Sequence, residues 1–539
     1  MQILPRLWQP TDITGKLEVM QKKWWTLVVV CAATFMLLLD VTIVTVALPT
    51  IQSGLHASFS DLQWVVDAYA LTLASVLLAA GSLADRYGRR LLFSLGLIVF
   101  TLGSLLCGTA QSPIMLILSR SAQGIGGAML FATSLALLAQ NFEGKERGIA
   151  FAIWGAVTEV AAGLGPVLGG IITTGISWRG IFLVNLPIGV AALVVTKLKM
   201  EESKTSHAAR PDWAGFITLT AGLVSLIYGL IRAGETAWSE TGVDICLALA
   251  AMFFVVFVAL ERQADHPLFD LSLFRIPTFS GGLAAAFAMN GSLYAILLYL
   301  VLYLQDDLGY SALATGVRLL LLIGASTLAS MFAGVFSERM PVRWLIGPGL
   351  LLVGVGLLLM TGLDGSSSWT HLIPGFLVAG VGSGMVNPPL ASTAVGVVVP
   401  QRSGMASGVN TTFREIGIAT GIALYGSVFA STLRQKLGRD LANIPSLERH
   451  LPGVVTAVQQ GNATRAINAV HAPLRAPLVA AIHASFAGAL DILLVVSAVL
   501  ALVGAASSGL LIRRRDFVVA NHPPTTASTE SVGSHRVTR

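Results

Sequence analysis

Long apolar segments alternate with short polar ones along the whole of this 539-residue chain. Each apolar segment has roughly 20 residues, the length that an α-helix needs to cross the hydrocarbon core of a bilayer. The pattern predicts an all-α polytopic membrane protein with fourteen membrane-spanning helices. Their expected limits are 25–49, 62–83, 91–110, 114–138, 148–172, 181–199, 213–232, 243–261, 279–304, 314–336, 343–361, 371–399, 403–432 and 479–512.

A polar stretch after the sixth apolar segment, "MEESKTSHAARPD" (200–212), divides the chain. Two apolar segments follow it, and then six more, so the layout is six helices, an inserted pair, and six helices. The tail 521–539 has the composition of disorder. The domains expected are an N-terminal segment 1–23, a six-helix bundle 24–199, a linker with two additional helices 200–278, a second six-helix bundle 279–515 with an external loop 433–478, and a tail 516–539.

A weak internal repeat supports the two-bundle layout. "GSLADRYGRR" (81–90) follows the second helix, and "GVFSERMPVR" (334–343) follows the second helix of the later bundle. In both stretches a glycine precedes an acid-arginine pair, and an arginine comes last. Repeated halves of this kind are typical of secondary transporters, whose substrate site lies between the halves near the bilayer midplane.

Charge is sparse and its placement indicates orientation. Only 12% of the residues are charged, and the net charge is +6. Lys and Arg cluster in alternate loops, which predicts that both termini are cytoplasmic and that the basic charge does not serve nucleic-acid binding. The basic loop 433–478 is an exception, but long loops translocate largely regardless of charge.

Several function classes lack any sequence signal. The three cysteines, Cys31, Cys107 and Cys246, lie singly in apolar segments, so neither a disulfide framework nor a metal site is indicated. The first apolar segment is too long for a cleavable signal peptide. No Walker loop and no nucleophile–base arrangement is present. We expect no enzyme, no cofactor and no metal, and a transporter that uses an ion gradient.

Two opposite charges fall at matching depth in predicted spans. Asp40 lies roughly 22 Å along the first helix, and the depth of Arg120 in the fourth helix differs by roughly 5 Å. Arg120 shares a helical face with Gln123, Gly124 and Gly127. An acid this deep is costly and therefore functional by default. The pair is either a structural ion pair or a proton site in which Arg120 favours the ionised acid and burial favours the neutral one.

A second deep acid, Glu159, lies in the fifth predicted helix. It shares a face with small residues that include Gly155, Gly163 and Gly170, and Gly165-Pro166 permits a bend. Such a face packs against protein or lines a cavity rather than contacting lipid. Glu159 could carry a proton, anchor a cationic substrate or be a hydrogen-bonded structural acid.

Further polar residues are candidates for a substrate cavity. Asp67 is expected near the outer end of the second helix, where it either contacts substrate or is a solvated interfacial acid. Asn290 and Tyr294 in the ninth helix, together with Gln123, could line the cavity. Arg414 and Glu415 in the thirteenth helix could pair within the chain, and we favour a structural role for them.

The stretch 81–90 has the composition of a cytoplasmic latch. Gly81 is small enough for a neighbouring helix to approach, Asp85 and Arg86 can pair with each other or with a helix of the other half, and Gly88 permits a tight turn. Arg89 and Arg90 would hold the loop at the anionic membrane face. A charge cluster that only sets the orientation would explain the arginines but not the spacing of the glycines and the acid.

Seven stretches together carry a resemblance to a known family. "GSLADRYGRR", "LDVTIVTVALP" (39–49), "RSAQGIGGAML" (120–130) and "GLGPVLGGII" (163–172) resemble signatures of the drug:proton antiporters of the major facilitator superfamily. "WRGIFLVNLPIG" (178–189), "YLQDDLGYSA" (303–312) and "RSGMASGVNTTFREIG" (402–417) resemble its branch with fourteen spans. The resemblance covers about residues 24–515. Thr45, where the family usually has Asn, and Glu159, where a small or apolar residue is expected, depart from it.

The resemblance implies the major facilitator fold, with Gly165, Pro166, Gly169 and Gly170 as the packing and bending residues of the fifth helix. Together with the residues above, it predicts a proton-coupled antiporter that exports hydrophobic, cationic drugs or toxic small molecules across the cytoplasmic membrane. Its partners would be protons, such substrates and the lipid bilayer, and a monomer is expected. The alternatives are a dedicated exporter of one endogenous metabolite or lipid and, outside transport, a membrane scaffold or sensor. Deep charges at Asp40, Arg120 and Glu159 argue against the scaffold.

Overall fold

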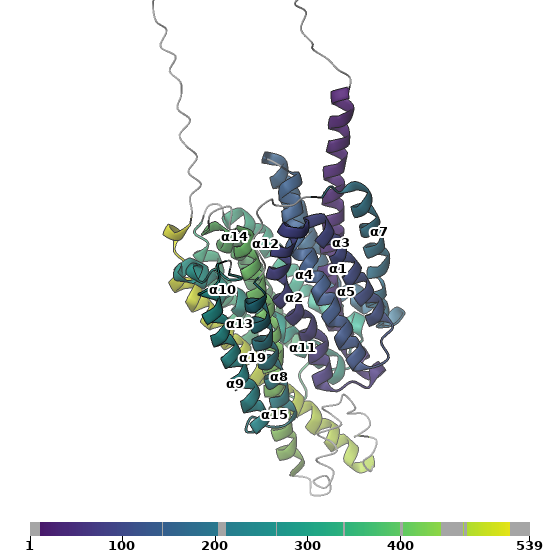
Figure 1. The fold of residues 1–539 in the computed structure, drawn as a ribbon. Helices are drawn as coiled ribbons and strands as arrows, with labels where there is room; N and C mark the ends of the chain where they lie inside the picture. Colours follow the sequence, from purple (N-terminus) through teal and green to yellow (C-terminus); the bar gives the residue numbers. More distant parts are fainter. Residues whose placement is uncertain are drawn as a thin grey trace, which may run out of the picture.

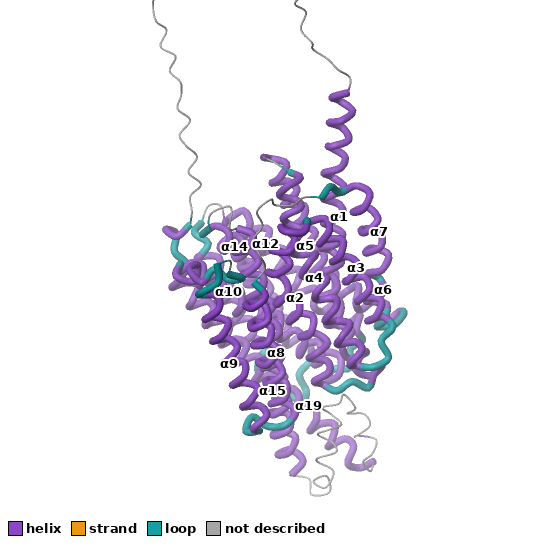
Figure 2. The backbone as a smooth tube through the Cα atoms, viewed as in Figure 1, coloured by secondary structure: helices purple, strands orange, loops and turns teal. Residues whose placement is uncertain are grey.

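The structure is a computed structural model that describes residues 11–142, 144–202, 212–265, 267–337, 340–398, 403–442, 467 and 472–517. Within these ranges all regular secondary structure is helical, as Figure 2 shows. The predicted all-α class is therefore confirmed.

The first bundle follows the predicted order with longer helices. It contains α1 (Thr11–Leu55), α2 (Phe59–Tyr87), α3 (Arg89–Gly108), α4 (Pro113–Asn141), α5 (Gly144–Gly175), α6 (Gly180–Leu183) and α7 (Asn185–Lys199). The predicted helix 181–199 is divided into α6 and α7. Ser58 begins α2 with a capping box, in which its hydroxyl accepts from Asp61 N at 3.1 Å and Asp61 Oδ2 accepts from Ser58 N at 2.8 Å.

The inserted pair consists of α8 (Trp213–Glu235) and α9 (Thr241–Glu261), which pack on each other. Asp212 begins α8 by accepting from Gly215 N at 2.8 Å. On its other side α8 packs against α2 and against α15 of the second bundle. The pair therefore lies beside the junction of the two halves.

The second bundle begins after a 3₁₀ turn, η1 (Leu271–Arg275). Its first span comprises α10 (Pro277–Met289), the π turn η2 (Asn290–Tyr294), α11 (Ala295–Leu302) and the π turn η3 (Tyr303–Asp307). The remaining elements are α12 (Ala312–Ser337), α13 (Arg343–Leu359), η4 (Trp369–Leu372), α14 (Ile373–Gly396), α15 (Ser403–Ala442), α19 (Ala472–Leu511) and η6 (Arg514–Asp516). Because α15 extends to Ala442 and α19 begins at Ala472, both ends of the range assigned to the external loop are helical.

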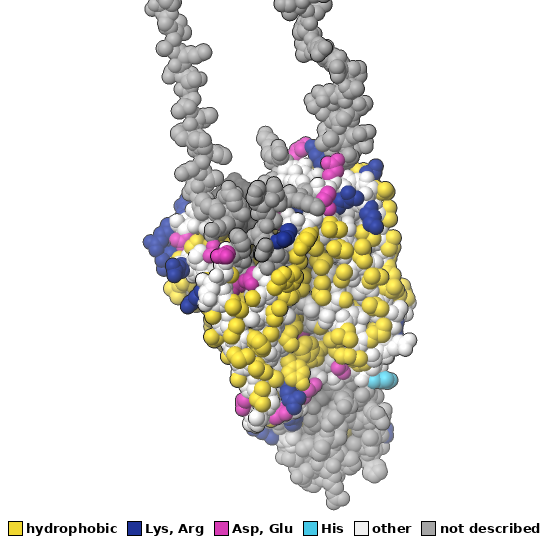
Figure 3. All heavy atoms as spheres, in the orientation of Figure 1, with side chains coloured by type: hydrophobic (Ala, Val, Ile, Leu, Met, Phe, Trp, Pro, Cys, Tyr) yellow, Lys and Arg dark blue, Asp and Glu magenta, His cyan; other side chains and the backbone are white. Residues whose placement is uncertain are grey.

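The helices are long and apolar enough to be membrane spans. Thirteen helices in the described part of the chain meet the length and hydropathy of a span, and α13 is a further apolar helix of 17 residues, near the lower limit of about 17 residues for crossing a bilayer. Apolar side chains cover the middle of the surface in Figure 3, and charged side chains gather towards its ends. The arrangement is compatible with the fourteen predicted spans.

The two bundles meet along two pairs of helices. We call the end at which α1 begins and the described chain stops at residue 517 the terminal end, and the opposite end the distal end (Figure 1). The bundles are joined by α2 with α15 and by α5 with α12. At the distal end, Gln305 Nε2 donates to Val46 O at 2.8 Å, and the rings of Phe59 and Phe429 stack at 5.5 Å.

The apolar core consists of several clusters of buried residues. One large cluster joins the distal parts of the first bundle, such as Ile51 and Trp178, to residues of the second bundle such as Tyr299 and Phe429. A separate cluster in the terminal half, around Phe93 and Phe100, consists of first-bundle residues together with Met200, which directly follows α7. A third cluster joins Leu71 and Leu78 of α2 to α8 and to second-bundle residues such as Phe279 and Ala406. The two bundles therefore share buried apolar contacts at the distal end and towards the terminal end.

Candidate functional site

Asp40 and Arg120 form an ion pair inside the first bundle. Asp40 lies on α1 and Arg120 on α4, and Arg120 Nη1 donates to Asp40 Oδ2. Asp40 is fully buried and Arg120 is 1% exposed. The polar, small-residue face of α4 that the sequence indicates is therefore the face that points into the bundle.

The other carboxylate oxygen of Asp40 has two amide donors. Gln123 Nε2 of α4 donates to Oδ1 at 3.2 Å, and Asn185 Nδ2 of α7 donates to it at 2.9 Å. Both amides also reach Ser104 Oγ of α3, at 2.7 and 3.3 Å. Residues of α4 and α7 therefore donate to the carboxylate of α1, and α3 supports their amides, which is the satisfied geometry that a buried ion pair requires.

Arg120 has further acceptors and an aromatic partner. Its Nε donates to Val65 O at 3.1 Å, and its Nη1 also reaches Gln123 Oε1 at 2.9 Å. The guanidinium lies 4.2 Å from the centroid of the Tyr69 ring, a distance at which a cation is attracted to the ring face. Arg120 thereby links the Asp40 network to α2, the helix that contacts the second bundle.

Asp67 is a buried acid without a partner. It lies on α2, is fully buried, and neither of its carboxylate oxygens has a hydrogen-bond partner in the described part of the chain. One turn earlier, Gln63 Nε2 donates to Ile422 O of α15 at 3.1 Å, and Tyr299, which is close enough to Asp67 to interact electrostatically, donates to the same carbonyl at 2.7 Å. Asp67 therefore faces the junction of the halves and is not solvated.

Glu415 reaches the same region from the second bundle. It lies on α15, is half-buried, and is within electrostatic range of its neighbour Arg414. Asp40, Arg120 and Glu415 are all within electrostatic range of the Tyr69 hydroxyl. Tyr69 thus lies between the ion pair of the first bundle and a carboxylate of the second.

The small-residue face of α5 packs on both bundles. A Cβ at Gly165 would collide with Thr42 of α1, and one at Gly169 would lie 2.8 Å from Ile43 O. A Cβ at Gly170 would lie 2.5 Å from the Cα of Leu313 on α12, and one at Gly316 would be close to Pro166 O. Glu159 lies within α5, but its side chain is outside the described part of the structure.

The two residues expected in a cavity of the ninth span lie in the π turn η2. Asn290 is buried and donates to Ala286 O of its own helix at 2.9 Å. Tyr294 is half-buried, and its hydroxyl accepts from Asn387 Nδ2 at 3.2 Å. The π turn, which is often found at functional sites, was not predicted from the sequence.

The stretch 81–90 makes its contacts within the first bundle. Asp85 Oδ1 pairs with Arg89 Nη2 at 2.8 Å, whereas Arg86 is exposed. Gly88 has φ +125° at the turn between α2 and α3, a conformation that favours glycine. The close approach of a helix expected at Gly81 is not made here, because a Cβ there would have nothing within 4 Å.

The same loop is tied to the end of the first bundle. Arg90 Nη2 donates to Lys197 O of α7 at 2.7 Å. The carboxylate of Glu202 accepts from Arg90 N and Leu91 N, both at 3.0 Å, and so caps the start of α3. Glu338 and Arg339 of the related stretch 334–343 lie outside the described residues.

Sequence reasoning missed several members of the site. Asn185 donates to Asp40, Ser104 accepts from the amides around Asp40, and Tyr69 stacks on Arg120. An amide in the apolar stretch "FLVNLPIG" and an acid in the thirteenth span are visible signals. Their proximity is not, because it depends on how four helices and two bundles pack. Among the described residues no group of acids, histidines and cysteines could hold a metal ion.

Comparison with known proteins identifies the class to which this geometry belongs. Residues 30–422 match the Major Facilitator Superfamily, and the chain belongs to that family. It is a multi-pass membrane transporter rather than an enzyme. In the solved structure of a bacterial homologue of the human lysosomal transporter Spinster, the same fold covers 93% of this chain and 99% of that chain, with a TM-score of 0.60 and 16% identity.

Individual relatives are similar over most of their length. Multidrug resistance protein Stp of Mycobacterium tuberculosis is 36% identical, with 80% of this chain and 79% of the relative covered. Puromycin resistance protein pur8 of Streptomyces alboniger is 35% identical, with 76% and 82% covered. The probable actinorhodin transporter of Streptomyces coelicolor is 35% identical, with 76% and 73% covered.

Proposed function

We propose that this protein is a proton-coupled antiporter that exports hydrophobic, cationic small molecules across the cytoplasmic membrane, with both termini cytoplasmic. The observation that carries the proposal is the buried Asp40–Arg120 pair with its amide shell. A bundle that needed only stability would be equally stable with apolar residues there, because desolvating two charges offsets much of their attraction. The names of the relatives, which refer to drug resistance and antibiotic transport, support the substrate class.

Proton coupling follows from the chemistry of the pair. A proton that binds Asp40 removes the charge that attracts Arg120 and leaves the guanidinium to seek other acceptors. Because Arg120 stacks on Tyr69 of α2, its displacement would disturb the helix that contacts α15. Neutralisation of Asp40 is thereby linked to the junction along which the halves move.

Asp67 is proposed as a second proton carrier. An ionised carboxylate without any donor or counterion would be strongly disfavoured at a fully buried position, so this environment accommodates the protonated form. The distal end, where the bundles share a core, would be external and closed in this conformation. Opening it would hydrate Asp67 and allow its proton to exchange with the outside.

A cationic substrate would be attracted by carboxylates at or near the junction of the halves. Glu415 is half-buried on the second bundle and close to Tyr69, and Glu159 is a further candidate on sequence grounds. An exporter of one endogenous compound is the second candidate, and similarity to the probable actinorhodin transporter favours it. Both functions share the proton site and differ in substrate range.

Everted membrane vesicles test the proposal directly. Acidifying the vesicle lumen should drive uptake of a fluorescent cationic dye, and nigericin, which collapses the pH gradient, should abolish the uptake. Vesicles without the protein provide the background. Uptake that persists after the gradient is collapsed would contradict proton coupling, and uptake of one compound among many tested would favour the dedicated exporter.

The substrate charge is tested at Glu415. Glu415→Gln should lower the transport of a monovalent cationic dye more than that of a neutral compound, because only the cation loses an attractive charge. The measurement is the ratio of the two initial rates in vesicles. Glu240→Gln is the matched control, since this glutamate lies outside the spans and hydrogen bonds from Arg232 hold its pKa below the ordinary value. An unchanged ratio in Glu415→Gln would exclude Glu415 as the cation anchor.

A further inference from the structure

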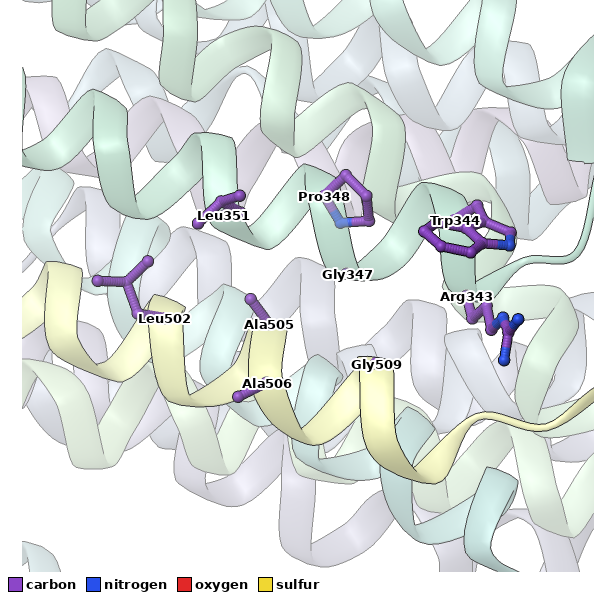
Figure 4. A pocket seen from close by; sticks show the side chains of 9 residues that line it. All are labelled: Arg343, Trp344, Gly347, Pro348, Leu351, Leu502, Ala505, Ala506 and Gly509. Carbon is purple, nitrogen blue, oxygen red and sulfur yellow. The ribbon is translucent and has the colours of Figure 1, made fainter.

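A groove opens on the outer surface of the second bundle, between α13 and α19. Figure 4 shows it along the two helices, with Arg343 at one end. Its volume is about 520 Å³, within the range of about 300–1,000 Å³ that is usual for ligand sites. The lining residues are Arg343, Trp344, Gly347, Pro348, Leu351, Leu502, Ala505, Ala506 and Gly509.

The groove exists because small residues lie where the two helices meet. A Cβ at Gly347 would be 3.7 Å from Ala505 O, so the helix backbones approach closely there. Beside this contact the space is empty, since a Cβ at Gly509 would meet nothing within 4 Å. Pro348, inside α13, has no N–H to donate to the carbonyl of Trp344 four residues earlier. The floor is therefore apolar, with one backbone acceptor near the charged end.

The groove faces the membrane rather than the interior of the bundle. Leu351 is 48% exposed and Trp344 is 53% exposed, and both lie on helices that cross the bilayer. Tryptophan is enriched at the level of the lipid headgroups, and Trp344 begins the first turn of α13 beside Arg343. One end of the groove is thus at headgroup depth, and the other, at Leu351 and Leu502, is at the depth of the acyl chains.

Arg343 supplies an unpaired positive charge at the headgroup end. Its side chain is exposed, and among the described residues its contact is with the ring of Trp344, 5.1 Å from the guanidinium carbon. The first turn of α13 contains no acidic residue. The N-terminal end of a helix also carries partial positive charge. An anion at this position would therefore meet attraction from both sources.

We infer that this groove binds an anionic phospholipid, with an acyl chain along the apolar floor and the phosphate at Arg343. Charge complementarity selects this occupant: basic sites between membrane helices recognise acidic headgroups. A cationic transport substrate would be repelled by Arg343, so the groove is not a second substrate site. The lipid would join α13 to α19 on the side of the bundle away from the Asp40 network, and its binding does not depend on the proposed transport.

Native mass spectrometry of the full-length protein in detergent, with added phosphatidylglycerol or phosphatidylcholine, tests the inference. Gly509→Phe should fill the groove without a clash at its Cβ, and Arg343→Gln should remove the charge. One basic residue near a membrane surface contributes about 1 kcal/mol, so Arg343→Gln should weaken phosphatidylglycerol binding about fivefold. Gly509→Phe should reduce the bound fraction of both lipids.

Two control variants introduce the same ring or remove the same kind of charge outside the groove. Leu510→Phe places the same ring on the neighbouring, 76% exposed position outside the groove, and Arg262→Gln removes an exposed arginine at the end of α9. Both should bind phosphatidylglycerol like the unmodified protein. Three results would each overturn the inference. Gly509→Phe could retain phosphatidylglycerol, the controls could lose as much binding as the groove variants, or the unmodified protein could bind the two lipids equally. Displacement of the lipid by inorganic phosphate would also overturn the inference, because the site would then recognise the phosphate without the acyl chain. Dye efflux is a separate readout, so its failure would contradict the transport proposal and leave the lipid site standing.

Discussion

The two six-helix bundles share a layout but differ in what they bury. The first bundle encloses Asp40, Asp67 and Arg120 at 1% exposure or less. In the described part of the second bundle the buried polar residues are neutral, among them Asn290, Ser292 and Ser497. Tyr425 illustrates the contrast, because its hydroxyl donates to Gly291 O at 2.7 Å and lies 3.2 Å from Ser497 Oγ, with no charge involved.

The difference indicates that the two repeated bundles have different roles. A hydrogen bond between neutral groups holds helices together with little dependence on pH, whereas a buried acid can change its charge and so respond to a proton. The fully buried acids therefore lie in the first bundle, whereas in the second bundle Asp307, whose side chain is 4% exposed, pairs with His483 Nδ1 at 2.8 Å. The second bundle contributes the half-buried Glu415 at the junction and, on its outer surface, the groove beside Arg343.

The largest effect is expected at Asp40. Asp40→Asn should abolish gradient-driven efflux, because the amide cannot carry a proton, and it should destabilise the protein by about 3–5 kcal/mol, since Arg120 loses its counterion. Efflux in everted vesicles and the thermal unfolding midpoint are the measurements. The double variant Asp40→Asn with Arg120→Gln should recover stability but not efflux. Normal proton-driven efflux in either variant would remove Asp40 from the mechanism.

Asp67 should show a different balance of the two effects. Because Asp67 has no partner to lose, Asp67→Asn should change the unfolding free energy by only about 1 kcal/mol. Gradient-driven efflux should fall, and so should the number of protons released when substrate binds to the detergent-purified protein. Asp61→Asn, which alters a half-buried acid in the first turn of the same helix, is the control for proton release. Unchanged proton release in Asp67→Asn would restrict the coupling to Asp40.

The smallest effect is expected in the second bundle. Tyr425→Phe removes one neutral hydrogen bond and should lower the unfolding free energy by about 1 kcal/mol. The dependence of efflux on the pH gradient should stay the same, because no titrating group is altered. Parallel measurements of unfolding midpoint and efflux against gradient would check this. A shift in the gradient dependence would show that the second bundle takes part in proton coupling.

Much of the fold was predictable from the sequence because span length and charge placement are local properties. Apolar segments of bilayer length predicted the helices, and the repeated loop stretch predicted two halves. Helix ends were less predictable: α1 begins well before residue 25, and α15 continues to Ala442, because the length of an apolar segment does not fix where a helix ends. The π turns in the span 277–307 left no signal in the apolar pattern.

For the site, the sequence by itself determined which residues had to be explained. Asp40, Arg120, Asp67 and Glu415 stand out because charges inside apolar segments are costly. Only the tertiary structure decided their partners: it gave Asp40 an amide shell from α4 and α7, left Asp67 without a donor, and placed Glu415 within electrostatic range of Tyr69. The physical reason is that the cost of a buried charge depends on depth, which the sequence encodes locally, whereas its compensation depends on donors from helices far apart in the chain. The groove beside Arg343 was likewise invisible until α13 and α19 were seen side by side.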